Sequence, residues 1–177
     1  MKRVSVTTSY VVSFLFFLTV FFAASVLTPF TDEARAAGGT AKGTIKLKDK
    51  TVDVKYAYFI KAPDSFDESK TVSTVIITPN DISQKITECQ SGSCASGITE
   101  GMTVGKEDFG GTIRVVYWVV TKDGMMQYSG NDDVSALVLT TDTADRMAGK
   151  LTIDDSAAEG PKIDVEFDAP LAKEFKE

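Results

Sequence analysis

The chain has 177 residues, two cysteines and no histidine, and its net charge is −6. The missing histidine excludes Ser-His-Asp and Cys-His catalysis, zinc or haem ligation through histidine, and histidine proton shuttles. The acidic balance disfavours nucleic acid and anionic membrane surfaces as partners of the folded part, so we expect neither.

Residues 1–36 have the pattern of an export signal. Two basic residues near the start precede an apolar run over residues 11–27, and Ala34-Arg35-Ala36 places small residues before a cleavage point. We therefore expect residues 37–177 to be exported to the periplasm or the extracellular space as a single β-rich domain. The apolar run approaches the length of a bilayer span, so an uncleaved membrane anchor is the alternative.

The exported part begins with a predicted β-hairpin over residues 44–60. Apolar residues alternate with polar ones on both sides of the Asp49-Lys50 pair, which is the pattern of two strands with one buried face. Residues 71–78 form a β-branched run that ends at Pro79 and is typical of a central strand buried on both faces.

One short helix is predicted over residues 80–89. Apolar residues recur there at helical spacing, Asn80 or Asp81 can cap the N-terminus, and Gly92 and Gly97 follow as breakers. Further strands are predicted from apolar or alternating segments at residues 110–120, 125–129, 134–141, 150–155 and 161–170. The tail, residues 171–177, is compatible with a short helix.

Seven or eight strands interrupted by one short helix predict a mainly β fold. We expect a single antiparallel β-sandwich or open barrel, preceded by the N-terminal hydrophobic signal helix. Strands do not alternate with helices along the chain, which disfavours a parallel α/β sheet.

Two stretches resemble a group of small exported bacterial proteins. Residues 42–71 are similar to a hairpin that leads into an Ala-Tyr strand, here Tyr56-Ala57-Tyr58, and then into a Pro/Phe/Asp loop, here with Phe66-Asp67-Glu68. Residues 147–172 are similar to a closing strand that ends in Phe-x-Ala-Pro. Members often carry a histidine where Tyr56 stands. The resemblance covers less than half of the exported part and implies export and one β-rich domain, without a mechanism or site residues.

Cys89 and Cys94 are the only cysteines of the chain. A structural zinc site normally needs four Cys or His ligands, which this chain lacks, and a thioredoxin-type redox pair has two intervening residues rather than four. Export places both thiols in an oxidising compartment. We therefore predict a Cys89–Cys94 disulfide that braces the end of the helix.

No catalytic, cofactor-binding or metal-binding residue is predicted. The glycine-rich stretches match neither GxxxxGK[ST] nor GxGxxG, so no nucleotide cofactor is expected, and the acidic pairs lack the spacing of an EF-hand loop. Those pairs are Asp132-Asp133, Asp142 with Asp145, and Asp154-Asp155, and turn formation explains them best. Tyr56 and Tyr58 share one face of the hairpin and are candidate ligand-facing aromatics, with core packing as the alternative.

These features favour an exported, non-catalytic protein that acts by binding or as an accessory envelope protein, with a protein or a carbohydrate as ligand. The alternative is a small carboxylate-dependent hydrolase or sugar-active enzyme, in which two Asp or Glu side chains converge in a cleft.

Overall fold

The computed structural model describes residues 38–67, 69–106, 112–122 and 124–176. The predicted signal segment, residues 1–36, lies outside these ranges. In the described part no helix is long and apolar enough to cross a bilayer.

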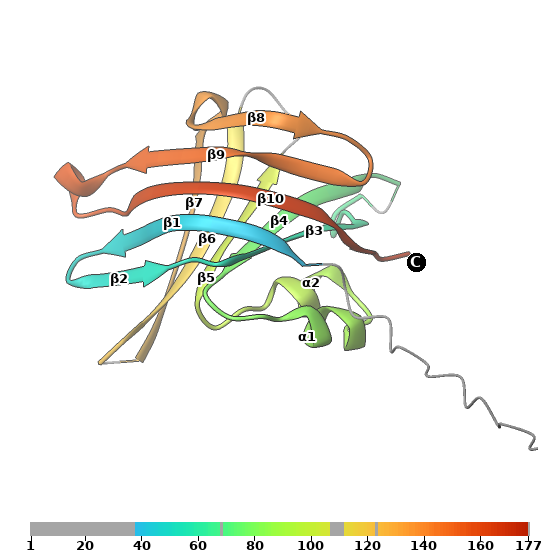
Figure 1. Ribbon diagram of the computed structural model, residues 1–177, viewed down its shortest axis with the longest axis horizontal. Helices are drawn as coiled ribbons and strands as arrows, with labels where there is room; N and C mark the ends of the chain where they lie inside the picture. Colours follow the sequence, from blue (N-terminus) through green and yellow to red (C-terminus); the bar gives the residue numbers. More distant parts are fainter. Residues whose placement is uncertain (1–37, 68, 107–111, 123, 177) are drawn as a thin grey trace, which may run out of the picture. The chain divides into compact units, whose positions relative to one another are not determined.

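The described residues form ten strands, two short α-helices and two 3₁₀ turns (Figure 1). The strands are β1 (Gly39–Leu47), β2 (Lys50–Asp53), β3 (Tyr56–Pro63), β4 (Thr71–Thr78), β5 (Gly101–Lys106), β6 (Thr112–Thr121), β7 (Gly124–Asp133), β8 (Leu137–Asp142), β9 (Arg146–Asp154) and β10 (Lys162–Glu174). The helices are α1 (Ser83–Glu88) and α2 (Gly92–Ser96), and the 3₁₀ turns are η1 (Val134–Ala136) and η2 (Ser156–Ala158).

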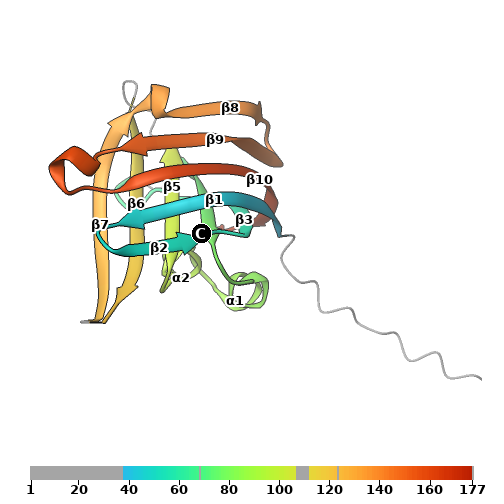
Figure 2. The ribbon, with the colours of Figure 1, turned by 60° about the vertical axis from the view of Figure 1, so that its left-hand side comes forward.

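All ten strands belong to one curled sheet. The strand order is β7-β6-β5-β4-β3-β1-β10-β9-β8, and β2 pairs with β1 beside this path. Every pairing is antiparallel except the one between the end of β10 and β3, which is parallel. Strands β8, β9, β10 and β1 cross β5, β6 and β7 steeply in both ribbon views, as expected of a sheet curled into a half-barrel (Figure 2).

The sheet is buried on both faces where β3 to β6 pass through its middle. The inner face packs the larger core, which includes Phe59, Val75, Met102 and Val115. The outer face of the same strands packs a smaller core with the helices, which consists of Tyr58, Ile60, Ile76, Ile86, Cys89, Ala95, Ile98, Val116, Trp118 and Phe175. Alternate residues of these strands therefore serve two separate cores, which explains their nearly continuous apolar sequence.

The predicted hairpin exists, but its second strand is divided. β2 pairs with the end of β1, whereas β3 pairs with the start of β1 and with β4. The chain passes between these positions at Val54-Lys55, where the Lys55 amide donates to the Thr78 carbonyl at 3.0 Å. One alternating run thus provides two strands with different partners.

Two of the predicted elements differ from the structure. The prediction of one helix within the sheet region is wrong, because residues 92–96 form a second helix, α2. The Ser91 side chain caps this helix by accepting a hydrogen bond from the Cys94 amide. Residues 171–174 do not form the short helix that the sequence of the tail allows, since β10 continues to Glu174 and pairs with β3. The structure adds β5, which the sequence patterns did not assign.

Candidate functional site

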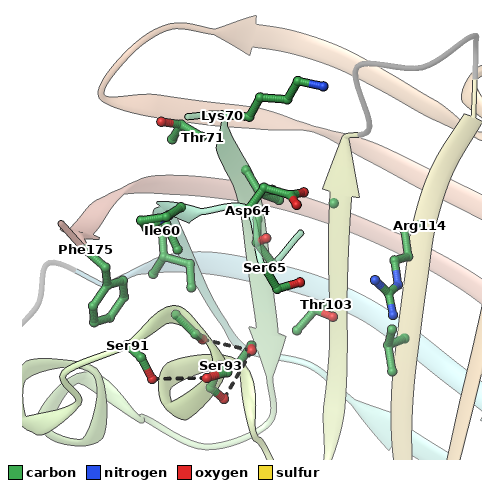
Figure 3. Close-up of a pocket in the computed structure, with 18 of the residues that line it drawn as sticks. Ile60, Asp64, Ser65, Lys70, Thr71, Ser91, Ser93, Thr103, Arg114 and Phe175 are labelled. Carbon is green, nitrogen blue, oxygen red and sulfur yellow. Dashed lines mark hydrogen bonds between the residues drawn. The ribbon is translucent and has the colours of Figure 1, made fainter. Parts of the chain in front are cut away.

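A groove of about 1010 Å³ lies on the outer face of the sheet, beside the two helices. Its floor is formed by outward-facing residues of β3 to β7, and its walls are the β3–β4 loop, α2 and the chain after β10. Figure 3 shows Phe175 and Arg114 at opposite ends of this groove. Its volume is at the upper end of the range for small-molecule pockets, which suits an extended ligand.

The floor changes from apolar to polar along its length. Near the helices it consists of Ile60, Val116 and Trp118, which are almost completely buried. Away from the helices the outward positions are occupied by Thr103 and Arg114. Because these residues are next to one another on paired strands, an apolar surface and polar donors are available to the same ligand.

The β3–β4 loop forms one rim and exposes a single phenylalanine. Phe66 is 95 % exposed, the most exposed large apolar side chain among the described residues. Its amide donates to Oδ1 of Asp64 at 2.7 Å, and the Asp67 amide donates to the same oxygen at 3.0 Å. At the base of the loop, the Asp64 amide donates to the Lys70 carbonyl at 2.9 Å. The loop is therefore held by its own hydrogen bonds while it presents Phe66 to solvent.

The opposite wall is α2, and the predicted disulfide holds it. Cys89 and Cys94 are bonded, with their Cα atoms 5.6 Å apart, so the prediction of this disulfide is confirmed. The bond joins the end of α1 to the middle of α2 and leaves Ser91 and Ser93 at the groove. Lys173 donates to the Cys89 carbonyl at 2.6 Å, which adds a contact from β10.

The groove is basic, although the whole chain is acidic. The described lining residues include two acidic side chains, Asp64 and Asp67, and four basic ones, which are Lys70, Lys106, Arg114 and Lys176. Lys106 pairs with Asp142 of β8 at 2.9 Å, and Lys70 lies 3.5 Å from Asp67. The exposed guanidinium of Arg114 has no hydrogen-bond or ion-pair partner within the described ranges.

The two acids of the groove are engaged within their own loop. Oδ1 of Asp67 accepts from the Ser69 hydroxyl at 2.6 Å, and this hydrogen bond, with help from Lys70, lowers the pKa of Asp67 below its ordinary value. A general acid requires the opposite shift, a raised pKa that keeps the carboxyl protonated near neutral pH. This arrangement therefore fits a structural loop better than an acid–base pair.

The candidate aromatics do not form a ligand-facing pair. Tyr58 is fully buried in the outer core, so its prediction as a ligand-facing residue is wrong. Tyr56 is half-buried and packs against the same core. Neither tyrosine lines the groove. The reason is that the outer core, to which Ile86 of α1 and Ala95 of α2 belong, packs on this face of β3. The period-two pattern of the hairpin could not reveal this packing.

The acidic pairs have local partners. Asp133 caps η1 by accepting from the Ser135 amide at 2.7 Å, and Asp154 accepts from Lys162 and from the Ser156 hydroxyl. In the described ranges, no three His, Cys, Asp or Glu side chains cluster so that they could hold a metal ion.

Comparisons with protein-family models, with curated proteins and with solved structures gave no match to this chain. The groove must therefore be interpreted from its own residues. Sequence reasoning missed Arg114 and Phe66 as site residues, because one is a single charge in an apolar strand and the other a single aromatic in a polar loop. What marks them as site residues is their exposed position at the groove, which exists only in the folded chain.

Proposed function

We propose that the protein is an exported, non-catalytic binding protein of the periplasm or the extracellular space, and that the groove on the outer face is its ligand site. The observation that carries this proposal is Phe66, which is 95 % exposed on a hydrogen-bonded loop at the rim of a groove of about 1010 Å³. Water contacts nearly the whole of this apolar ring, and a ligand in the groove would cover it.

Two further observations support binding. The floor combines apolar side chains with hydroxyl and guanidinium donors, which is the usual composition of a binding cleft. The walls are stabilised by a disulfide and by hydrogen bonds of the β3–β4 loop, so little conformational entropy is lost when a ligand binds.

The alternative, a carboxylate-dependent hydrolase, has weaker support. Its active site needs two acids about 5–9 Å apart, one with a raised pKa. The groove offers Asp64 and Asp67, which both accept hydrogen bonds from backbone amides of the β3–β4 loop, and the pKa of Asp67 is lowered.

The experiment for the binding site is site-specific photo-crosslinking in cells that export the protein. Benzoylphenylalanine replaces Phe66 in one variant and Val138 in a matched control. Val138 is also an exposed apolar residue, at 62 %, but it lies on β8 and does not line the groove. We expect discrete cross-linked products from position 66 and none of the same mass from position 138. Equal products from both positions, or none from position 66, would refute the proposed site.

Export is tested by the intact mass of the protein recovered outside the cytoplasm. A chain that starts at residue 37 is expected from the Ala34-Arg35-Ala36 pattern. Recovery of the full 177-residue chain in the membrane fraction would instead support the anchor.

A further inference from the structure

We infer that the ligand of the groove is an acidic, extended segment of another protein, with a carboxylate that pairs with Arg114 and an apolar side chain that covers the adjacent floor. This inference rests on the proposed binding function and names its ligand class. It depends on Arg114, on the charge of the groove and on the burial of its aromatic rings.

The position of Arg114 suits a carboxylate. It lies near the start of β6, on the outer face, opposite Gly105 of β5 and Asn131 of β7. Since Gly105 has no side chain, it leaves the guanidinium uncovered on that side. Arg146, the other arginine in the described ranges, already binds the carboxylate of Asp168 through two nitrogens. A ligand carboxylate could form the same bidentate hydrogen-bonded pair with Arg114.

The charge of the groove favours an acidic partner over a neutral one. Among the described lining residues, four basic side chains stand against two acidic ones, within a chain whose net charge is −6. Lys70 is paired with Asp67 and Lys106 with Asp142, so Arg114 and Lys176 supply the attraction. An acidic ligand is therefore attracted to this groove and repelled by much of the remaining surface. Because most of the charged lining residues are exposed to water, this attraction should weaken with added salt.

The apolar floor favours a peptide over a glycan. A sugar ring usually stacks on the open face of an aromatic ring, but Trp118 and Phe175 are only 9 % and 7 % exposed. At this exposure the two rings offer only a shallow apolar surface, which a protruding aliphatic or aromatic side chain of a peptide can cover. On the α2 side, the hydroxyls of Ser91 and Ser93 hydrogen-bond to each other at 3.1 Å, and Ser91 also accepts from the Cys94 amide. One of the two hydroxyl hydrogens is left to donate to a peptide carbonyl.

The test uses the full protein, purified from cells that export it, and a displayed library of random twelve-residue peptides. We expect the selected peptides to be enriched in Asp or Glu next to an apolar residue. Synthetic, fluorescein-labelled versions of them should bind the Arg114→Gln variant at least about tenfold more weakly in fluorescence anisotropy, the effect of losing one charge-assisted contact. Lys46→Gln is the matched control, because Lys46 is an exposed cation of β1 outside the groove.

A second variant addresses the floor without removing a charge. A Cβ atom on Gly105 would lie 4.0 Å from its nearest neighbours, the carbonyl oxygens of Arg114 and Ser73, so Gly105→Leu fits the backbone and fills the space beside Arg114. It should reduce peptide binding as strongly as Arg114→Gln does, while the circular dichroism spectrum stays that of the native protein.

Three results would overturn the inference: no enriched peptide, enrichment without acidic residues, or equal binding by Arg114→Gln and the native protein. Binding of polygalacturonate oligosaccharides that requires Arg114, in place of peptides, would also overturn it. In each case cross-linking at position 66 decides separately whether the groove is a binding site. Failure of the ligand class is thereby distinguished from failure of the proposed function.

Discussion

The hydroxyl of Tyr58 in β3 donates a 2.6 Å hydrogen bond to Oδ1 of Asp81, and the same hydroxyl accepts from the Ile82 amide at 3.0 Å. Asp81 also accepts from the Ser83 amide at 2.8 Å. One buried side chain of the sheet thus organises the residues that begin α1. Burial, and secondarily the bond to Asp81, raises the pKa of Tyr58 well above its ordinary value.

The change Tyr58→Phe should therefore destabilise the fold. It removes the donor to Asp81 and leaves the Ile82 amide without its acceptor, at a cost of about 1–3 kcal/mol in the free energy of unfolding. Urea denaturation followed by tryptophan fluorescence measures this loss, because Trp118 belongs to the same core.

Tyr117→Phe is the matched control on the inner face. The Tyr117 ring stacks on Tyr128 with centroids 5.4 Å apart, and its buried hydroxyl has no hydrogen-bond partner among the residues that the structure describes. Burial raises its pKa to about 12. Removing this hydroxyl should be neutral or slightly stabilising, since no hydrogen bond is lost. Equal losses in the two variants would contradict the role of the Tyr58 hydroxyl.

Replacement of both Cys89 and Cys94 by alanine should lower the free energy of unfolding by about 2 kcal/mol, the chain-entropy value for a six-residue loop. The unfolding midpoint in urea is the measurement. The same variant should bind the selected peptides more weakly under native conditions, because α2, which forms one wall of the groove, loses its covalent link to the end of α1. A free-thiol assay that finds two reactive thiols in the native protein would contradict the disulfide itself.

Gly43→Ala should disrupt the pairing of β1 with β10. Gly43 has a φ of +121°, and a Cβ atom there would lie 2.0 Å from the carbonyl oxygen of Asp164. Both effects require the backbone to move, so we expect a loss of about 3 kcal/mol or more in the free energy of unfolding. Gly105→Ala, whose Cβ would meet only ordinary contacts, is the control and should stay within about 0.5 kcal/mol of the native protein. Thermal unfolding of both variants distinguishes these outcomes, and a stable Gly43→Ala protein would refute the close approach.

Asp154 should contribute an acid-sensitive increment of stability. The hydrogen bond from Lys162, followed by those from Ser156, lowers its folded-state pKa from 3.8 to about 2. Because the folded pKa lies below the unfolded one, the contribution is complete above about pH 4 and is lost as the pH falls through about 2. The melting temperature of Asp154→Asn should therefore lie below that of the native protein at pH 6 and approach it at pH 2.

Asp49→Asn controls for the loss of one negative charge, since Asp49 is an exposed residue of the β1–β2 turn. Its melting temperature relative to the native protein measures the effect of removing one negative charge from an exposed turn. A constant difference between Asp154→Asn and the native protein across the whole pH range would contradict the shifted pKa.

Local patterns predicted much of the secondary structure. The alternation around the Asp49-Lys50 pair located β1 and β2, and the β-branched run at residues 71–78 located β4. β5 could have been predicted, because Met102 and Val104 alternate with small residues over a short run. Its two glycines, which are uncommon within strands, argue against a strand there. The tail could not be predicted, since its parallel pairing with β3 depends on residues more than 100 positions earlier.

By itself the sequence determined the mainly β character and the central position of β4, because both follow from apolar spacing within a few residues. It also determined the pairing of Cys89 with Cys94, because the chain has no other cysteine. Only the tertiary structure decided the single curled sheet and the groove. Phe66, Ser91, Arg114 and Phe175 come from four separate segments, and long-range strand pairing brings them to one face. Which tyrosine is buried, and which arginine is paired with a carboxylate, depends on the three-dimensional neighbours of each residue, and no local pattern records those.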